Sequence, residues 1–431
     1  MKIRQAAIVD PEQNSAYVLP AIALSMFVFA YSVNFGPISI LAFYGCWLLP
    51  FIIAPRVVLG RPGPVVLLLV IPIFFTLSMV WSDAAGTTLR AAIQYGITIF
   101  AGLVAARITS VGNLALGGTI GGAIVLLYSA ANGGYSYDYI DGDFAFNGAF
   151  SSKNQLGYFA TLAILFSLSL VFIFRSHRAV HPFALATAAL GAVLLWMSDS
   201  ATSLLSAIAA FAAITFMGIV LNLAPALRRA IVFLVIGGTV VLGFASLRLG
   251  AFNALLGAFG RDTSLTGRTY LWSEAIVFGA DRPILGLGYN AFWVHGRPAA
   301  EQLWQDFYIT ARTGFHFHNL LIETYVGLGL VGLALVVGLC ILLFVMPLSA
   351  ALGQGSVGSI MLFSGLAILF LVRSVAEVDF ITPHTVGSFL VAFILLRLFD
   401  HNRDVRHALH LTKPSAKRRH PSLGAPQTVL E

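Results

Sequence analysis

Charged residues are scarce in this chain, since Asp, Glu, Lys and Arg make up only 10% of its 431 residues. A soluble domain carries about 25% charged residues, so this chain cannot cover a water-facing surface along its whole length. Hydrophobic residues make up 58% of the chain. The composition therefore excludes a soluble globular protein and predicts that lipid surrounds most of the chain.

Cysteine is almost absent as well. Cys46 and Cys340 both lie in apolar runs, which excludes a disulfide framework and predicts buried free thiols. The net charge of +7 would suit a nucleic-acid partner. The basic residues lie beside apolar runs, as in the cytoplasmic loops of membrane proteins, so we predict no nucleic-acid partner. No cleavable signal peptide is expected either, because the first apolar run is long enough to be a full span.

Long apolar runs recur along the whole chain. A transmembrane helix needs about 20 mostly apolar residues, and this length predicts an all-α integral membrane protein with about 12 transmembrane helices. The expected spans lie near residues 17–35, 38–54, 64–81, 91–107, 112–131, 154–174, 182–198, 202–221, 230–247, 319–346, 356–372 and 384–399.

The basic residues indicate the orientation of these spans, because cytoplasmic loops are rich in Lys and Arg. The short outer loops hold Arg90, Lys153 and Arg373, whereas the predicted cytoplasmic segments hold Lys2, Arg4, Arg56, Arg61, Arg107, Arg175, Arg178, Arg228, Arg229, Arg403, Arg406, Lys413, Lys417, Arg418 and Arg419. Both termini are therefore expected in the cytoplasm. The chain divides into spans within 1–247, a large outer loop at 248–317, spans within 318–400 and a basic tail at 401–431.

The large outer loop breaks the pattern of short connections. Within it, Leu271, Ala275 and Phe278 fall at helical spacing, which predicts a short amphipathic helix at the membrane surface. Arg268 would lie in the first turn of this helix, where a cation is unfavourable because it opposes the helix dipole. The same position allows the arginine to bind an anion together with the helix amides. The alternative is an arginine that snorkels to the membrane interface.

The end of this loop and the start of the next span carry four polar residues, His316, His318, Asn319 and Glu323. Two histidines two residues apart do not share a helix face, and no Cys or carboxylate at metal spacing accompanies them, so we predict no metal. A histidine at the outer end of a span is suited to proton transfer near neutral pH. Asn319 either caps the next helix or binds substrate, and Glu323, inside the span, is expected to pair with an arginine.

Three further features of the outer side leave alternatives open. Arg373 and Glu377 form either a simple i,i+4 ion pair or part of the same outer cavity. Lys153 either anchors to headgroups or meets a lipid phosphate. The pair Gly286-x-Gly288 lacks the third glycine of a dinucleotide fingerprint and predicts a tight turn.

Taken in order, these motifs resemble those of a known group. The run Gly267-Arg268-x-x-x-Trp272, Pro283-x-x-Gly286-x-Gly288, His316-x-His318-Asn319 and Gly327-x-Gly329 resembles the signature of the O-antigen ligase and Wzy-type O-antigen polymerase superfamily. The segments 150–154 and 373–377 are similar to its exopolysaccharide-polymerase (ExoQ-type) branch.

The resemblance implies a GT-C-like fold and metal-independent, cofactor-free glycosyl transfer at the outer face of a bacterial inner membrane. The donor would be an undecaprenyl-pyrophosphate-linked oligosaccharide and the acceptor a sugar hydroxyl. Arg268 would hold the pyrophosphate and His318 would assist the acceptor, with Arg261, Arg282 and Arg373 as candidates for a second arginine. Membrane lipid and a chain-length regulator protein are the other expected partners.

Three functions compete at this point. The first is a polymerase of lipid-linked repeat units, for an exopolysaccharide or O-antigen. The second is a ligase that moves a finished glycan onto lipid A-core or a protein, using the same donor site. The third is a transporter or flippase, which predicts a charged path through the membrane centre, where the predicted spans carry few charges.

Overall fold

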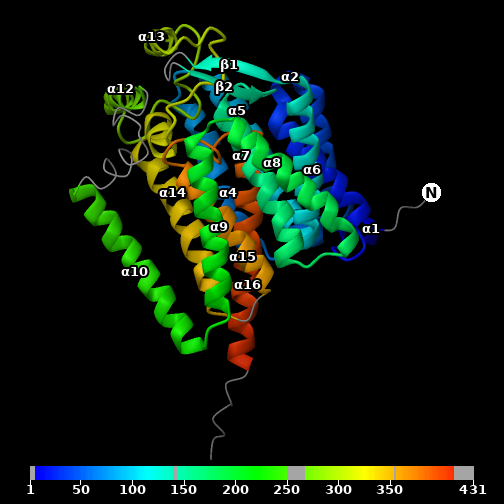
Figure 1. Cartoon of the computed structure of the whole chain (residues 1–431). Coiled ribbons are helices and arrows are strands. Elements are labelled where there is room, and N and C mark those ends of the chain that lie inside the picture. Colours follow the sequence, from blue (N-terminus) through cyan, green and yellow to red (C-terminus); the bar gives the residue numbers. More distant parts are fainter. Residues whose placement is uncertain (1–4, 139–142, 250–266, 354–355, 412–431) are drawn as a thin grey trace, which may run out of the picture.

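The computed structural model describes residues 5–138, 143–249, 267–353 and 356–411. These residues form a bundle of long helices with a short β-hairpin at one end (Figure 1). The first half contains α1 Ala6–Val9, α2 Ser15–Ile53, α3 Pro55–Leu59, α4 Pro62–Leu77, η1 Ser78–Val80, α5 Ala85–Ile108, α6 Val111–Asn132, β1 Gly134–Asp138 and β2 Asp143–Gly148. The remainder contains α7 Lys153–Leu168, η2 Ser169–Ile173, η3 Arg178–Val180, α8 His181–Met197, α9 Ala201–Leu221, α10 Pro225–Leu249, α12 Arg268–Ala280, α13 Pro298–Asp306, α14 Leu320–Ala351, α15 Val357–Arg373 and α16 Val386–Leu411.

Among the described residues, 9 helices are long and apolar enough to cross a membrane, and α15 is a shorter apolar helix. The protein is therefore a multi-pass membrane protein, as its composition predicts. The expected total of about 12 spans stays a prediction. The last predicted span corresponds to the first part of α16, and most of the predicted basic tail lies outside the described residues.

The 39 residues of α2 contain two of the predicted spans. Gly36 has a φ of +67°, a conformation that glycine adopts without strain, and the chain reverses there. The rings of Phe29 and Phe43 lie 5.0 Å apart, and the Trp47 indole donates to Ser25 Oγ at 2.8 Å. In a continuous helix these partners would be separated by about 20 to 33 Å, so α2 folds back on itself.

Glycines let the central helix α6 approach two neighbours closely. A Cβ at Gly121 would lie 2.7 Å from Met26 of α2, and one at Gly122 would lie 2.8 Å from Ala163 of α7. Small residues at helix contacts are typical of packing in lipid, where association depends on close van der Waals contact. In contrast, α10 lies apart from the bundle and is largely exposed, so lipid is its expected neighbour (Figure 1).

The glycine motifs of the outer loop fasten that loop to the bundle. Gly286 and Gly288 both have positive φ, which confirms the predicted turn. The Gly288 N–H donates to Gly327 O at 2.8 Å, where α14 approaches its break at Gly329 (φ +62°). A Cβ on Gly329 would lie 2.3 Å from the backbone of Ile284, so the close contact between the two backbones requires glycine at position 329.

The predicted helix of the outer loop is present as α12, whose Leu271 and Ala275 are fully buried. Together with Trp304 of α13 and Phe317, they form a small core separate from the main one. A loop with short interfacial helices was expected, but the position of α13 and the hairpin of β1 and β2 were not predicted from the sequence. This small core gives the loop a fixed shape at one end of the bundle (Figure 1).

Candidate functional site

Glu377 is the centre of a polar cluster that four distant segments build. Its Oε1 accepts a hydrogen bond from Asn154 Nδ2 at 2.7 Å and lies 3.5 Å from Arg268 Nη2. Its Oε2 lies 3.7 Å from His316 Nε2 and 3.6 Å from His318 Nδ1. The structure thus brings together the two residues with predicted catalytic roles, Arg268 and His318, on one carboxylate.

The electrostatics of this cluster favour an ionised carboxylate. Burial would raise the pKa of Glu377, but His318, then His316 and Arg373, lower that pKa well below its usual range. Burial and then repulsion from His318 lower the pKa of His316 to about 3, so His316 is neutral near pH 7. The Nδ1 atom of a neutral His316 accepts the backbone N–H of His318 at 3.0 Å. The ring proton of His316 therefore lies on Nε2, toward Glu377.

The segment that carries the histidines is held on both sides. Trp272 of α12 donates its indole N–H to Phe317 O at 2.8 Å, and the Phe317 N–H donates to Glu323 Oε2 at 2.8 Å. His318 has a φ of +50°, a backbone conformation that costs free energy for any residue other than glycine. Backbone strain of this kind persists where the surroundings impose it, and it often marks a functional position.

Asn319 and Glu323 both support this segment. Asn319 caps α14, because its side-chain oxygen accepts the N–H groups of Leu321 and Ile322. The expected arginine partner of Glu323 is wrong for the described part of the chain, where the carboxylate receives the Phe317 N–H and, at 3.5 Å, the Trp293 indole N–H. Neutral donors satisfy this carboxylate, which thereby holds the histidine-bearing backbone, and contact of Glu323 with substrate stays a prediction.

Asn154 reaches Glu377 because two helix caps meet beside it. Ser152 caps α7 by accepting the Gln155 N–H, which places Asn154 in the first turn. Ser200 caps α9 and also donates its hydroxyl to Asn154 Oδ1 at 2.7 Å. This contact fixes the amide orientation of Asn154, so that its NH₂ group faces Glu377.

Arg373 lies behind Glu377 and is fully buried, with 1% of its surface exposed. Its guanidinium forms a two-point hydrogen-bonded pair with Asp379, stacks over the Tyr158 ring at 4.1 Å and donates to Ser203 Oγ at 3.2 Å. The carboxylate that pairs with the Arg373 guanidinium is thus Asp379 and not Glu377. This burial argues against direct contact between Arg373 and a substrate, and it supports a role in placing the loop that carries Glu377.

The other predicted binding residues lie elsewhere. Arg282 forms an ion pair with Asp83 at 2.8 Å, and Arg297 shares that carboxylate at 2.9 Å, so both arginines fasten the outer loop to the segment after α4. Lys153 immediately precedes Asn154, and its contact with substrate stays a prediction. Arg261 lies outside the described residues.

His316, His318 and Glu377 also form a geometry that could hold a metal ion, since their ligand atoms all lie within 4.8 Å of one another. The expectation that no carboxylate accompanies the histidines is therefore wrong. The fold supplies Glu377 from a loop far along the chain, and sequence spacing could not show this. The same carboxylate already receives Asn154 and faces Arg268, and a nearby guanidinium opposes a divalent cation.

Several residues of the cluster were missed in the sequence. Asn154 and Asp379 stand beside Lys153 and Glu377, so their positions gave a weak signal. Ser200 and Ser203 gave none, because serine hydroxyls in or beside apolar spans usually bond to nearby backbone. Tyr158 gave none either, because it contacts Arg373 through its ring. Their partners come from other helices, which only the fold brings together.

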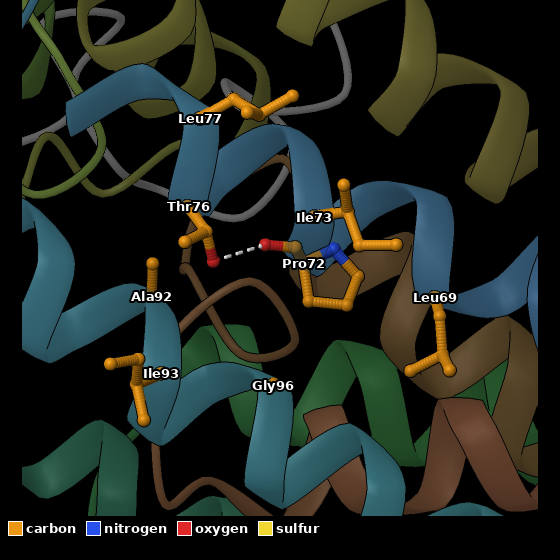
Figure 2. A pocket seen from close by; sticks show the side chains of 8 residues that line it. All are labelled: Leu69, Pro72, Ile73, Thr76, Leu77, Ala92, Ile93 and Gly96. Carbon is orange, nitrogen blue, oxygen red and sulfur yellow. Dashed lines mark hydrogen bonds between the residues drawn. The ribbon is translucent and has the colours of Figure 1, made fainter. Parts of the chain in front are cut away.

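An apolar groove of about 340 Å³ opens between α4 and α5 (Figure 2). Leu69, Ile73 and Ile93 are among its lining residues. The Thr76 hydroxyl donates to Pro72 O at 2.8 Å and is satisfied within the helix. No residue of the Glu377 cluster lines this groove, which offers apolar contact and no reactive group.

The cluster contains the groups needed for a reaction in which a hydroxyl displaces an anionic leaving group. Arg268 can hold an anion, and its side chain remains 16% exposed. The Nε2 atom of His318 can accept a proton when Nδ1 faces Glu377. A cation and an oriented base on one carboxylate suit a reaction in which an anionic leaving group departs and a hydroxyl attacks.

Comparison with known proteins gives two matches. The sequence profile of the O-antigen ligase family (Wzy_C) matches residues 186–337, which include Arg268, His316 and His318. The exopolysaccharide production protein ExoQ of Rhizobium meliloti (strain 1021) is 41% identical over 395 residues, which cover 91% of this chain and 90% of that protein.

Proposed function

Because the chain belongs to the O-antigen ligase family, which transfers glycans, we propose that it polymerises lipid-linked oligosaccharide repeat units into an exopolysaccharide or O-antigen. The donor would be an undecaprenyl-pyrophosphate-linked oligosaccharide, and the acceptor a sugar hydroxyl on a second glycan. The observation that carries this proposal is the meeting of Arg268, His316 and His318 on Glu377.

In the proposed reaction, His318 Nε2 takes the proton of the acceptor hydroxyl as its oxygen attacks the anomeric carbon. The bond from that carbon to the pyrophosphate oxygen breaks, and undecaprenyl pyrophosphate leaves with the electron pair. Glu377 orients His318 through Nδ1 and stabilises the imidazolium that forms, as a carboxylate does in other acid–base dyads. The Nδ1–Oε2 distance of 3.6 Å is long for a hydrogen bond, and such contacts often tighten when substrate binds.

Arg268 would stabilise the pyrophosphate as its charge grows. It lies at the first position of α12, where the helix amides also point toward an anion, and a planar guanidinium matches phosphate oxygens. A fixed cation in a poorly hydrated site can supply this stabilisation without a metal. The proposed reaction is therefore metal-independent, although His316, His318 and Glu377 have ligand geometry.

The location and topology belong to the same proposal. We place the protein in a bacterial inner membrane with both termini cytoplasmic, about 12 spans and a GT-C-like arrangement. The Glu377 cluster then faces the periplasm, where a lipid pyrophosphate at the membrane surface meets it. A chain-length regulator is the expected protein partner, and the basic tail would face the cytoplasm.

A ligase is the second candidate, because the matching family profile is described as an O-antigen ligase. The similarity to a protein named for exopolysaccharide production covers far more of the chain and favours polymerisation. Both functions use the same donor site. They differ in the acceptor, which would be another repeat unit for a polymerase and lipid A-core or a protein for a ligase.

Deletion of the gene in its own host should test the function. We expect high-mass polysaccharide to disappear and single repeat units to accumulate on undecaprenyl pyrophosphate, as measured by gel filtration and mass spectrometry of lipid extracts. Complementation with Arg268→Ala should fail, whereas Arg312→Ala, an exposed arginine of the same loop that pairs with Glu301, should restore polymer.

Two outcomes of the deletion would contradict polymerisation. Full-length polymer that remains on its lipid carrier, with lipid A-core or protein left unmodified, would identify the ligase. Unchanged polymer on its normal acceptor would reject both functions.

A further inference from the structure

The β-hairpin at one end of the bundle carries exposed aromatic rings. In its register Tyr135 lies opposite Phe146 and Tyr137 opposite Phe144, so all four rings lie on one face. The ring centroids of the two pairs are 5.2 Å and 4.9 Å apart. Tyr135, Tyr137 and Phe144 are 64%, 42% and 66% exposed, whereas Phe146 is buried against the main core, so three of the four rings form an exposed surface.

The polarity of this hairpin departs from the usual one at three aromatic positions. Antiparallel strands with one covered face normally turn apolar residues inward and polar residues outward. Here Ala145 and Asn147 are the buried residues of the opposite face, and β2 packs against the start of α7. Of the four rings, Phe146 alone is buried, so burial does not account for the aromatic residues at Tyr135, Tyr137 and Phe144. A cluster of exposed aromatic rings is typical of surfaces that contact a ligand, a partner or a membrane.

The aromatic face is linked to the Glu377 cluster through the chain itself. β2 ends at Gly148, and α7 begins at Lys153, so Asn154 follows the hairpin closely. Asn147 donates its amide to Ser136 Oγ of β1, and Asn154 donates to Glu377. The hairpin lies at the same end of the bundle as α12 and α13 (Figure 1).

We propose that the aromatic face formed by Tyr135, Tyr137 and Phe144 is a binding platform for the glycan chain of the substrate, an inference that rests on the proposed function. One sugar of each glycan reacts at His318, and the remaining sugars must lie on the water-facing surface at this end. The C–H face of a pyranose ring packs on the negative face of an aromatic ring. The three exposed rings offer neighbouring stacking positions for a chain of sugars.

A membrane-anchoring role is the competing explanation, because Tyr and Phe also gather at the headgroup layer. The two roles need different side chains. Sugar stacking requires a flat π surface, whereas insertion among lipid chains requires apolar volume, which leucine also provides. Substitution by Leu and by other aromatic residues therefore separates them.

The test uses three triple variants of the full-length protein in the host strain. Tyr135→Ala/Tyr137→Ala/Phe144→Ala and Tyr135→Leu/Tyr137→Leu/Phe144→Leu should each reduce the high-mass polysaccharide fraction about tenfold, which corresponds to a loss of about 1.4 kcal/mol of binding, while short products still form. Tyr135→Phe/Tyr137→Phe/Phe144→Tyr should keep the wild-type size distribution. Normal polymer in the Ala variant, or rescue by Leu, would overturn the platform.

A binding measurement separates this inference from the proposed function. Oligosaccharides prepared by partial acid hydrolysis of the strain's own polysaccharide are added to the purified full-length protein, and saturation-transfer NMR reports contact with their C–H groups. We expect transfer with wild type and with His318→Ala, and a loss of transfer with the triple Ala variant. Equal transfer to wild type and to the Ala variant, or none to wild type, would reject the platform whatever the catalytic result.

Discussion

His318→Ala is expected to lower the rate of glycosyl transfer by about 10²- to 10⁴-fold, the contribution of one positioned general base. The reason is geometric, because His318 Nδ1 faces Glu377 Oε2 at 3.6 Å and Nε2 is left to accept a proton. The measurement is the initial rate of product formation by the purified protein with lipid-linked donor. Binding of donor should persist, since Arg268 is unchanged.

The matched control for this variant is His295→Ala. His295 lies on the same outer loop, is 67% exposed and lies 3.9 Å from Glu301, outside the Glu377 cluster. It should retain the wild-type rate. Equal loss in both variants would indicate damage to the loop rather than loss of a base, and a wild-type rate in His318→Ala would reject the assignment of His318.

Glu377→Gln should also lower the rate by about 10²- to 10⁴-fold, although the side chain keeps its shape. The amide oxygen can still accept the Asn154 hydrogen bond, so the structural contact survives. The negative charge that orients His318 and stabilises its protonated form is lost. The initial-rate assay used for His318 measures this, together with thermal unfolding in detergent to establish that the fold is retained.

Two comparisons make this second result specific. Glu301→Gln removes a carboxylate that pairs with Arg312 on the same loop, and it should leave the rate near that of wild type. His318→Ala/Glu377→Gln should be little slower than either single variant, because the two residues act as one unit. A double variant whose loss equals the product of the single losses would contradict the proposed dyad.

Local features of this protein could be predicted from the sequence. The helical spacing of Leu271 and Ala275 gave α12, and Asn319 caps α14 as its residue type suggests. The turn at Gly286-x-Gly288 is also present. Each of these depends on residues that are close in sequence, where periodicity and backbone preference decide the structure.

The centre of the site depends on contacts that local rules cannot show. Glu377 and Asn154 meet although 223 positions separate them, and Glu377 completes a cluster with the histidines that spacing seemed to exclude. Glu323 and Arg373 were assigned partners by charge alone. Their partners are backbone and indole N–H groups for Glu323 and Asp379 for Arg373, because buried charges take whichever donors or acceptors the packing supplies.

The hairpin of β1 and β2 was missed for a related reason. Its aromatic residues alternate as in a strand, but the segment is short and lies between two apolar helices. Its polarity also departs from the usual arrangement, since Ala145 and Asn147 are buried while Tyr135 and Phe144 are exposed. Departures from local rules are expected at functional positions, and this one is the basis of the glycan platform.

The central claim is metal-independent transfer from a lipid pyrophosphate at the Glu377 cluster. It is tested most directly with purified full-length protein in liposomes, undecaprenyl-pyrophosphate-linked repeat units and excess EDTA. The account predicts longer lipid-linked glycans and one undecaprenyl pyrophosphate released for each new linkage, both lost in His318→Ala. No product with EDTA, and product restored by a divalent metal, would contradict the account and identify His316, His318 and Glu377 as a metal site instead.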